Sequence, residues 1–133
     1  MRTHQNHPLA LVVEDDPVTR RLLEELLKEQ GCQVDSVDDG ERAIEHLDTK
    51  AYRVILMDIV LPKKSGTDVM EHLRLTQPRL LQRVIVVSGL NVEEIRKLFP
   101  AVSQALSKPV MPSRLLHAVN LCLGRSHEQL TVV

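Results

Sequence analysis

Short apolar runs alternate with amphipathic segments along most of this chain. The first run, LALVV at residues 9–13, ends abruptly in three acids at 14–16. A short apolar run bounded by polar residues is typical of a buried strand. Asp16 and Pro17 then supply a helix cap and a first helical position, and leucines at helical spacing follow as far as Gly31. The pattern predicts a strand followed by a helix.

The same alternation occurs four more times. Apolar runs predict further strands at 33–37, 53–58, 84–88 and 104–108. Helical spacing predicts helices after the turn at 38–40, from Ser65 to a stop before Pro78, at 92–98, and at 113–123. Runs such as VILM and VIVV do not alternate with polar residues, so both faces of these strands should be covered by helices. The sequence predicts an α/β fold with a doubly wound parallel sheet, whose strand ends share one edge where ligands bind.

Composition narrows the function classes. The chain has 133 residues, enough for one domain with a proper core. Aromatic residues make up 2% and the formal net charge is −1, so the sequence lacks both the stacking platforms and the basic surface typical of nucleic-acid binding. No apolar run approaches the ~18 residues that span a bilayer, and we expect a cytoplasmic protein without membrane insertion. Cys32 and Cys122 lie outside any CxxC pair and are predicted to be small buried apolar residues.

Five polar residues fall at the predicted strand ends: Glu14, Asp15, Asp58, Ser88 and Lys108. Two carboxylates ~4 Å apart repel by roughly 4 kcal/mol at an effective dielectric of about 20, so the shared edge needs positive charge. Lys108 supplies part of it. Mg²⁺, which prefers carboxylate oxygens and leaves positions for phosphate, is suited to supply the rest.

This set of residues is suited to phosphoryl transfer, which needs a nucleophile, charge neutralisation and positioning. Asp58 ends the central buried strand and is the best candidate for a carboxylate nucleophile that forms an aspartyl phosphate. The adjacent acids Glu14 and Asp15 are better suited to bind metal. Lys108 and the Ser88 hydroxyl are predicted to contact phosphate oxygens.

The chain resembles the receiver domain of bacterial two-component response regulators over about residues 9–123. The likeness rests on the order and spacing of LVVEDD, VILMDIVLP with Gly66 four residues beyond Pro62, VVSG, and SKP. It implies a flavodoxin-like three-layer sandwich with five helices and strand order 2-1-3-4-5. The same resemblance implies three roles for the site residues and a cis Lys108-Pro109 bond. Asp58 is the expected phosphoacceptor, Ser88 the hydroxyl switch and Lys108 the phosphate-binding lysine. The expected metal is Mg²⁺, for which Mn²⁺ can substitute. Its expected ligands are Glu14, Asp15, Asp58 and the main-chain carbonyl of Val60.

The resemblance also implies partners. A histidine kinase or histidine phosphotransfer protein is the expected phosphoryl source, and the expected output is a downstream protein or a phosphorylation-linked dimer, without direct nucleic-acid contact. We expect a phosphoacceptor and not a turnover enzyme. The expected organisation is an extended or disordered segment at 1–8, a receiver domain at 9–124, and a short tail at 125–133 with no output domain. The output surface expected from the family comprises Val92, Arg96, Lys97, Ala105, Ser113 and Leu116.

Three positions depart from the common receiver pattern. Ala105 stands where many receivers have an aromatic ring that moves with the hydroxyl residue. Val60 and Leu90 stand two residues beyond the phosphoacceptor and the hydroxyl residue, where apolar groups cannot orient an attacking water. We therefore hypothesise slow self-dephosphorylation and a readout that does not use the usual ring.

Two alternative functions remain open. A phosphohydrolase of the haloacid dehalogenase type also uses an aspartate nucleophile, but it needs a second Asp two residues later, where this chain has Val60. A receiver-like module that binds partners without phosphorylation is the other alternative, and Ala105 weakly favours it. The turn Asp38-Asp39-Gly40 is assigned no role in the site. The six histidines show no metal-site spacing and are expected at the surface: His4, His7, His46, His72, His117 and His127.

Overall fold

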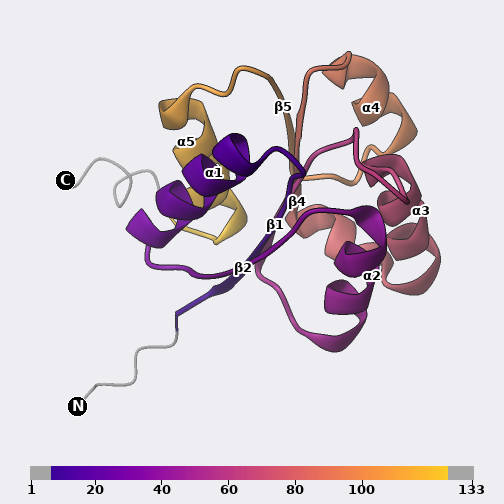
Figure 1. Cartoon of the computed structure of the whole chain (residues 1–133), viewed down its shortest axis with the longest axis horizontal. Coiled ribbons are helices and arrows are strands. Elements are labelled where there is room, and N and C mark those ends of the chain that lie inside the picture. The colour runs from indigo at the N-terminus through magenta and orange to yellow at the C-terminus, as the bar shows by residue number, and fades with distance from the viewer. Residues whose placement is uncertain (1–6, 126–133) are drawn as a thin grey trace.

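A computed structural model describes residues 7–125 as a five-stranded parallel sheet in the order β2-β1-β3-β4-β5, with helices on both faces (Figure 1). The predicted fold class and strand order are confirmed. Most of the expected segments 1–8 and 125–133 lie outside the described residues. The elements in chain order are β1 (Leu9–Val13), α1 (Pro17–Glu29), β2 (Gln33–Val37), α2 (Gly40–Thr49), β3 (Val54–Met57), α3 (Gly66–Thr76), the 3₁₀ helix η1 (Pro78–Arg83), β4 (Val84–Ser88), α4 (Val92–Leu98), β5 (Gln104–Ser107) and α5 (Pro112–Cys122).

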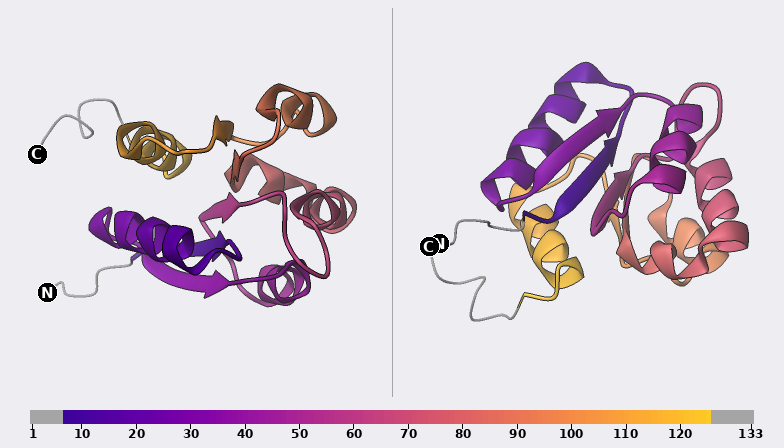
Figure 2. Two further views of the ribbon diagram at one scale, coloured as in Figure 1. Left: turned by 45° about the horizontal axis from the view of Figure 1, so that its top comes forward. Right: turned by 90° about the horizontal axis from the view of Figure 1, so that it is seen from below.

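The central strands are buried on both faces, as their unbroken apolar runs predicted. Successive residues of a strand point to opposite sides, so Ile55 and Met57 join one core cluster while Val54 and Leu56 join the other. Helices α1 and α5 cover the second of these faces, and α2, α3 and α4 cover the first (Figures 1 and 2). The sheet is therefore the middle of three layers, and its edge at the strand ends stays free for a site.

Side-chain caps fix where three of the helices begin. Asp16 and Asp39 each accept a hydrogen bond of 2.8 Å from the main-chain amide three residues later, at the starts of α1 and α2. Ser65 and Asp68 form a reciprocal capping box at the start of α3. All three caps stand directly after a strand or its loop, so they fix the path of the chain close to the strand ends.

Some boundaries and one element differ from the sequence prediction. Strand β3 is one residue shorter than expected at each end, β5 ends one residue earlier, at Ser107, and α5 begins and ends one residue earlier. The paired residues of the ladder stop at Met57 and Ser107, although the next amide along each strand still donates to its neighbour. The 3₁₀ helix Pro78–Arg83 was not predicted, since its sequence PRLLQR has no helical periodicity after the proline. Cys32 is buried as predicted, but Cys122 is only half-buried. Within residues 7–125, no helix has both the length and the apolar character needed to cross a membrane.

Candidate functional site

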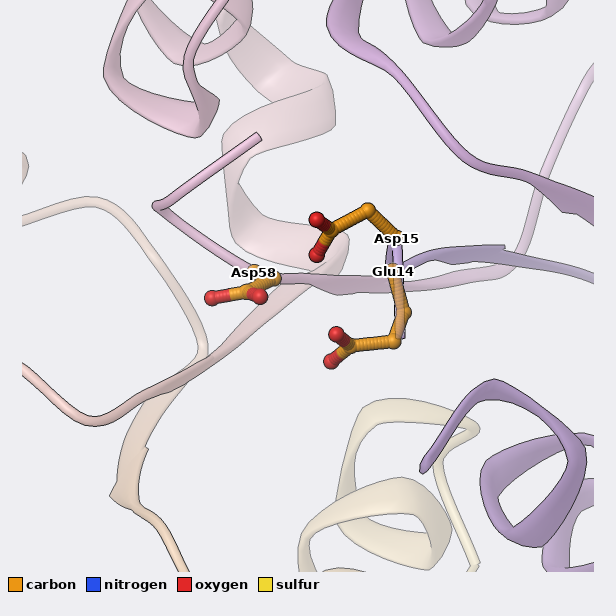
Figure 3. A group of neighbouring side chains, drawn as sticks. All are labelled: Glu14, Asp15 and Asp58. Carbon is orange, nitrogen blue, oxygen red and sulfur yellow. The ribbon is translucent and has the colours of Figure 1, made fainter. Parts of the chain in front are cut away.

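The ends of β1 and β3 are level, and this brings three carboxylates together. Val13 pairs with Met57, and the amide of Asp58 donates to the Val13 carbonyl at 3.0 Å. One carboxylate oxygen each of Glu14, Asp15 and Asp58 lies within 4.8 Å of the others. Figure 3 shows the three side chains converging from the two neighbouring strand ends. The structure thus brings together the acids that the sequence placed at one edge.

Lys108 reaches the same place from the end of β5. Its Nζ donates to Asp58 Oδ2 at 3.1 Å and lies 3.0 Å from Glu14 Oε1. Its main-chain amide donates to the Ser88 carbonyl at 2.9 Å, which ties the lysine to the end of β4. The Lys108-Pro109 bond is cis, as the resemblance predicted. The ammonium group therefore bridges two of the three carboxylates.

Burial makes the charge at this edge expensive. Glu14 is 1% exposed, and burial together with the nearby Asp58 carboxylate raises its pKa, although the Lys108 ammonium and the Asp16 amide act to lower it. For Lys108, burial alone would lower the pKa, but the carboxylates of Glu14 and Asp58 outweigh it and raise the pKa. The lysine is therefore held as a cation, while Glu14 carries an uncompensated cost for its negative charge.

The donor set fits a divalent cation. With all three acids ionised, the carboxylates carry three negative charges and Lys108 carries one positive charge, which leaves a net charge of −2. Glu14 Oε2 accepts from the Asp16 amide at 3.2 Å, whereas the buried Oε1 has no well-directed hydrogen bond within the described part of the chain, despite its ion pair with Lys108. Hard oxygen ligands with unused lone pairs are what Mg²⁺ binds in proteins.

The family model of the response regulator receiver domain matches residues 10–120. This chain belongs to that family. Over 117 residues it is 32% identical to the transcriptional regulatory protein CpxR of Escherichia coli strain K12, a match covering 88% of this chain and 50% of CpxR. The chain thus spans about half the length of the curated relatives it matches. Response regulator receiver domains are modules of phosphorelay signalling, so this chain is a signalling domain of that class.

Solved receiver structures share its fold. The receiver domain of sensor histidine kinase PA1611 from Pseudomonas aeruginosa PAO1 matches with a TM-score of 0.78 and 26% identity, covering 90% of this chain and 99% of that one. That structure has a magnesium ion coordinated in its active-site cleft. The BeF3-activated receiver domain of DrrB matches with a TM-score of 0.76 and 29% identity, covering 90% of this chain and all (100%) of that one.

The remaining predicted residues of this receiver domain lie on β4, β5 and the loops after β3 and β4. Ser88 ends β4 fully buried, and its hydroxyl oxygen accepts from the Leu90 amide at 3.0 Å. The Val60 amide donates to Asp58 Oδ1 at 3.3 Å. The side chains of Val60 and Leu90 are 60% and 51% exposed, so two apolar groups face solvent beside the site. Ala105 is half-buried against the core cluster that includes α4.

Two glycines that sequence reasoning left without a role hold the loop after β3. A Cβ atom on Gly66 would lie 2.2 Å from the Asp58 carbonyl oxygen, and one on Gly40 would lie 1.9 Å from the Lys64 carbonyl oxygen. Neither position can carry a side chain unless the loop moves. The turn before α2 therefore contacts the loop that leads away from the phosphoacceptor candidate, although it was predicted to be only a turn. The hints in the sequence were the glycines themselves and, for Gly66, its spacing from Pro62 in the receiver motif.

The sequence placed all the histidines at the surface, but His46 and His72 are half-buried. His72 Nε2 lies 3.0 Å from Asp48 Oδ1 and links α3 to α2. His46 Nδ1 lies 2.9 Å from the Arg42 carbonyl oxygen of its own helix. His7 and His117 are exposed, and His4 and His127 lie outside the described residues.

Proposed function

We propose that this receiver domain accepts a phosphoryl group on Asp58 and uses a Mg²⁺ ion held by Glu14, Asp15, Asp58 and the Val60 carbonyl. The observation that carries the proposal is the position of Lys108, whose ammonium contacts both Glu14 and Asp58 at 3.0–3.1 Å while the three acids still outnumber it. Such a site has one fixed cation, the lysine, and enough remaining negative charge to bind a second cation. The magnesium ion in the PA1611 receiver supports the same assignment by similarity.

The residues divide the work of phosphoryl transfer among them. A carboxylate oxygen of Asp58 forms a bond to phosphorus while the bond from phosphorus to the donor nitrogen or oxygen breaks. Lys108 and the Ser88 hydroxyl bind two of the phosphoryl oxygens, so the lysine exchanges part of its contact with Asp58 for phosphate. When bound, Mg²⁺ supplies further positive charge for the oxygens that gain charge during transfer. Both glycine contacts keep the loop carrying Val60 in place.

We infer a histidine kinase or histidine phosphotransfer protein as the phosphoryl source. The expected output is a change in protein contacts, through a downstream protein or a phosphorylation-linked dimer, on the surface formed by α4, β5 and α5. Leu98 on α4 and Leu121 on α5 are 63% and 47% exposed and lie on helices of that surface. Val60 has no ionisable group to move a proton, which favours a stable acceptor over a turnover phosphohydrolase.

Mass spectrometry after incubation with acetyl phosphate tests the proposal. Wild-type protein with Mg²⁺ should gain one phosphoryl group, while Asp58→Asn gains none and wild type in excess chelator gains little. Asp48→Asn serves as the matched control, because Asp48 is an exposed acid on α2 and should leave uptake unchanged. Equal uptake by wild type and Asp58→Asn, or none by wild type, would contradict the proposal. The second result would favour a module that binds its partners without phosphorylation.

A further inference from the structure

One arginine holds the main chain of both adjacent acids. Arg20 lies in the first part of α1, and its Nη1 donates to the carbonyl oxygen of Glu14 at 3.0 Å and to that of Asp15 at 3.3 Å. The arginine can reach back because α1 starts at Pro17, directly after the cap Asp16, whose carbonyl accepts from the Arg20 amide at 2.8 Å. A single guanidinium nitrogen therefore joins the helix to the turn that carries the acidic pair.

The turn has few other fixed points. The sheet ladder ends where the Glu14 amide donates to the Val37 carbonyl at 3.1 Å. Beyond it, the carboxylate of Asp15 is exposed and, within residues 7–125, accepts no hydrogen bond from a protein group. The direction of this side chain is therefore set by its main chain. Arg20 is the side chain that holds that main chain on its carbonyl side.

We propose that Arg20 is a positioning residue for the divalent-cation site, acting through the main chain of Glu14 and Asp15; this inference rests on the proposed function. Metal-ligand residues are commonly held by partners outside the ligand set, and losing such a partner weakens the site. Arg20 also brings a positive charge close to an acidic cluster, and charge alone would disfavour a bound cation. The two effects of removing Arg20 have opposite signs, so an experiment can separate them.

The test is a Mg²⁺ titration followed by ¹⁵N NMR, using the main-chain amide signals of Asp58 and Val60. Arg20→Met removes both the donors and the charge, and we expect Mg²⁺ to bind about tenfold more weakly. Arg20→Lys keeps the charge and a donor that can reach one carbonyl, and should fall between Arg20→Met and wild type. Arg21→Met is the matched control: Arg21 is an exposed neighbour on α1, with no hydrogen bond or ion pair to another described residue.

Metal-free spectra give a second readout. The amide signals of Asp15 and Asp16 should move in Arg20→Met and stay in place in Arg21→Met, because only the first variant releases the turn. Unchanged or tighter Mg²⁺ binding in Arg20→Met would overturn the inference, and so would a lower melting temperature with unchanged affinity in the folded protein. If Arg20→Met does not fold, Mg²⁺ binding by Arg20→Lys equal to wild type would overturn it.

The titration uses no phosphoryl donor, which separates this inference from the proposed function. A wild-type protein that binds Mg²⁺ at the acids but takes up no phosphoryl group would refute the proposed function, while the affinities of the variants would still decide the role of Arg20. A wild-type protein whose Asp58 and Val60 signals do not respond to Mg²⁺ would overturn both.

Discussion

Replacing Lys108 with Met should make the metal-free protein less stable and its Mg²⁺ binding tighter. The ammonium lies 3.0 and 3.1 Å from two carboxylates, and at an effective dielectric of about 20 each pair attracts by about 5 kcal/mol. Desolvation of the buried acids and solvent access to the lysine, whose side chain is 28% exposed, offset most of this. We expect a net loss of about 2 kcal/mol, or a fall of roughly 6–10 °C in melting temperature for a chain of this size.

Mg²⁺ should recover part of that loss. Without the lysine, the ionised site carries a net charge of −3 instead of −2, so the cation binds more tightly and stabilises the folded state further. Phosphoryl uptake at Asp58 should nevertheless fall, because the cation that binds a phosphate oxygen is gone. Affinity for Mg²⁺ and uptake of the phosphoryl group therefore change in opposite directions.

Urea unfolding followed by circular dichroism measures the stability of the metal-free protein in chelator and the stabilisation by Mg²⁺ at saturation. Lys97→Met is the matched control, since Lys97 is an exposed lysine on α4 without an ion pair in the described part of the chain. The reasoning is refuted if Lys108→Met unfolds at the same urea concentration as wild type in chelator. It is also refuted if the variant binds Mg²⁺ more weakly than wild type does.

Three further predictions concern stability, the loop and the phosphoryl lifetime. Hydrogen bonding from Tyr52 at 2.6 Å helps to overcome burial and hold the pKa of Asp35 below its usual value, so Tyr52→Phe should cost about 1.5–3 kcal/mol at pH 7. That difference should shrink as the pH falls through the lowered pKa and Asp35 gains a proton; a difference in urea midpoint that stays constant over the whole acid range would contradict it. Gly66→Ala should lower stability by about 1–3 kcal/mol and weaken Mg²⁺ binding in a titration, because the new Cβ displaces the loop; unchanged binding would argue against the contact. Val60→Asn combined with Leu90→Glu should shorten the lifetime of the phosphorylated protein, measured by its decay after donor removal, and a lifetime that does not shorten would count against slow self-dephosphorylation.

The fold was predictable because its signals are local and repeated. Each buried strand appears as an apolar run that ends in a polar residue, and each of the first three α-helices begins at a cap the sequence displays, such as Asp16 or Ser65. Parallel packing then follows from the need to cover both faces. The 3₁₀ helix at 78–83 has no such signal, because a short helix after a proline has too few residues to show a period.

The candidate site was predictable for the residues that stand at strand ends. Asp58 and Glu14 could be placed together because parallel strands of similar length end at one edge, and the register of β1 with β3 bears this out. The contacts that support those residues could not be predicted in the same way. Gly40 lies in the turn before α2, and its contact with Lys64 depends on how two loops pack, which no local pattern encodes.

Arg20 was missed for a different reason. From the sequence alone, an arginine in the first turns of a helix starting at Pro17 is expected to be a solvated charge on the outer face. Its function depends on the turn before the helix folding back, so that the carbonyls of Glu14 and Asp15 face the guanidinium. When a side chain donates to main-chain carbonyls, the sequence does not show which residues accept, because every residue has a carbonyl.

Under the proposed function, the same geometry limits how a phosphoryl group on Asp58 would be read out. If the Ser88 hydroxyl turns to a phosphoryl oxygen, it gives up its hydrogen bond from the Leu90 amide, and the loop before α4 loses that anchor. A ring at position 105 could follow the hydroxyl by changing rotamer, but Ala105 has a single methyl group and no rotamer to change. We expect the change to pass instead through the main chain into α4, a helix of seven residues capped by Asn91. Helices this short depend on packing for their stability. Helix α4 packs through Ile95, so we expect a shift of the loop before it to move this helix more easily than the others.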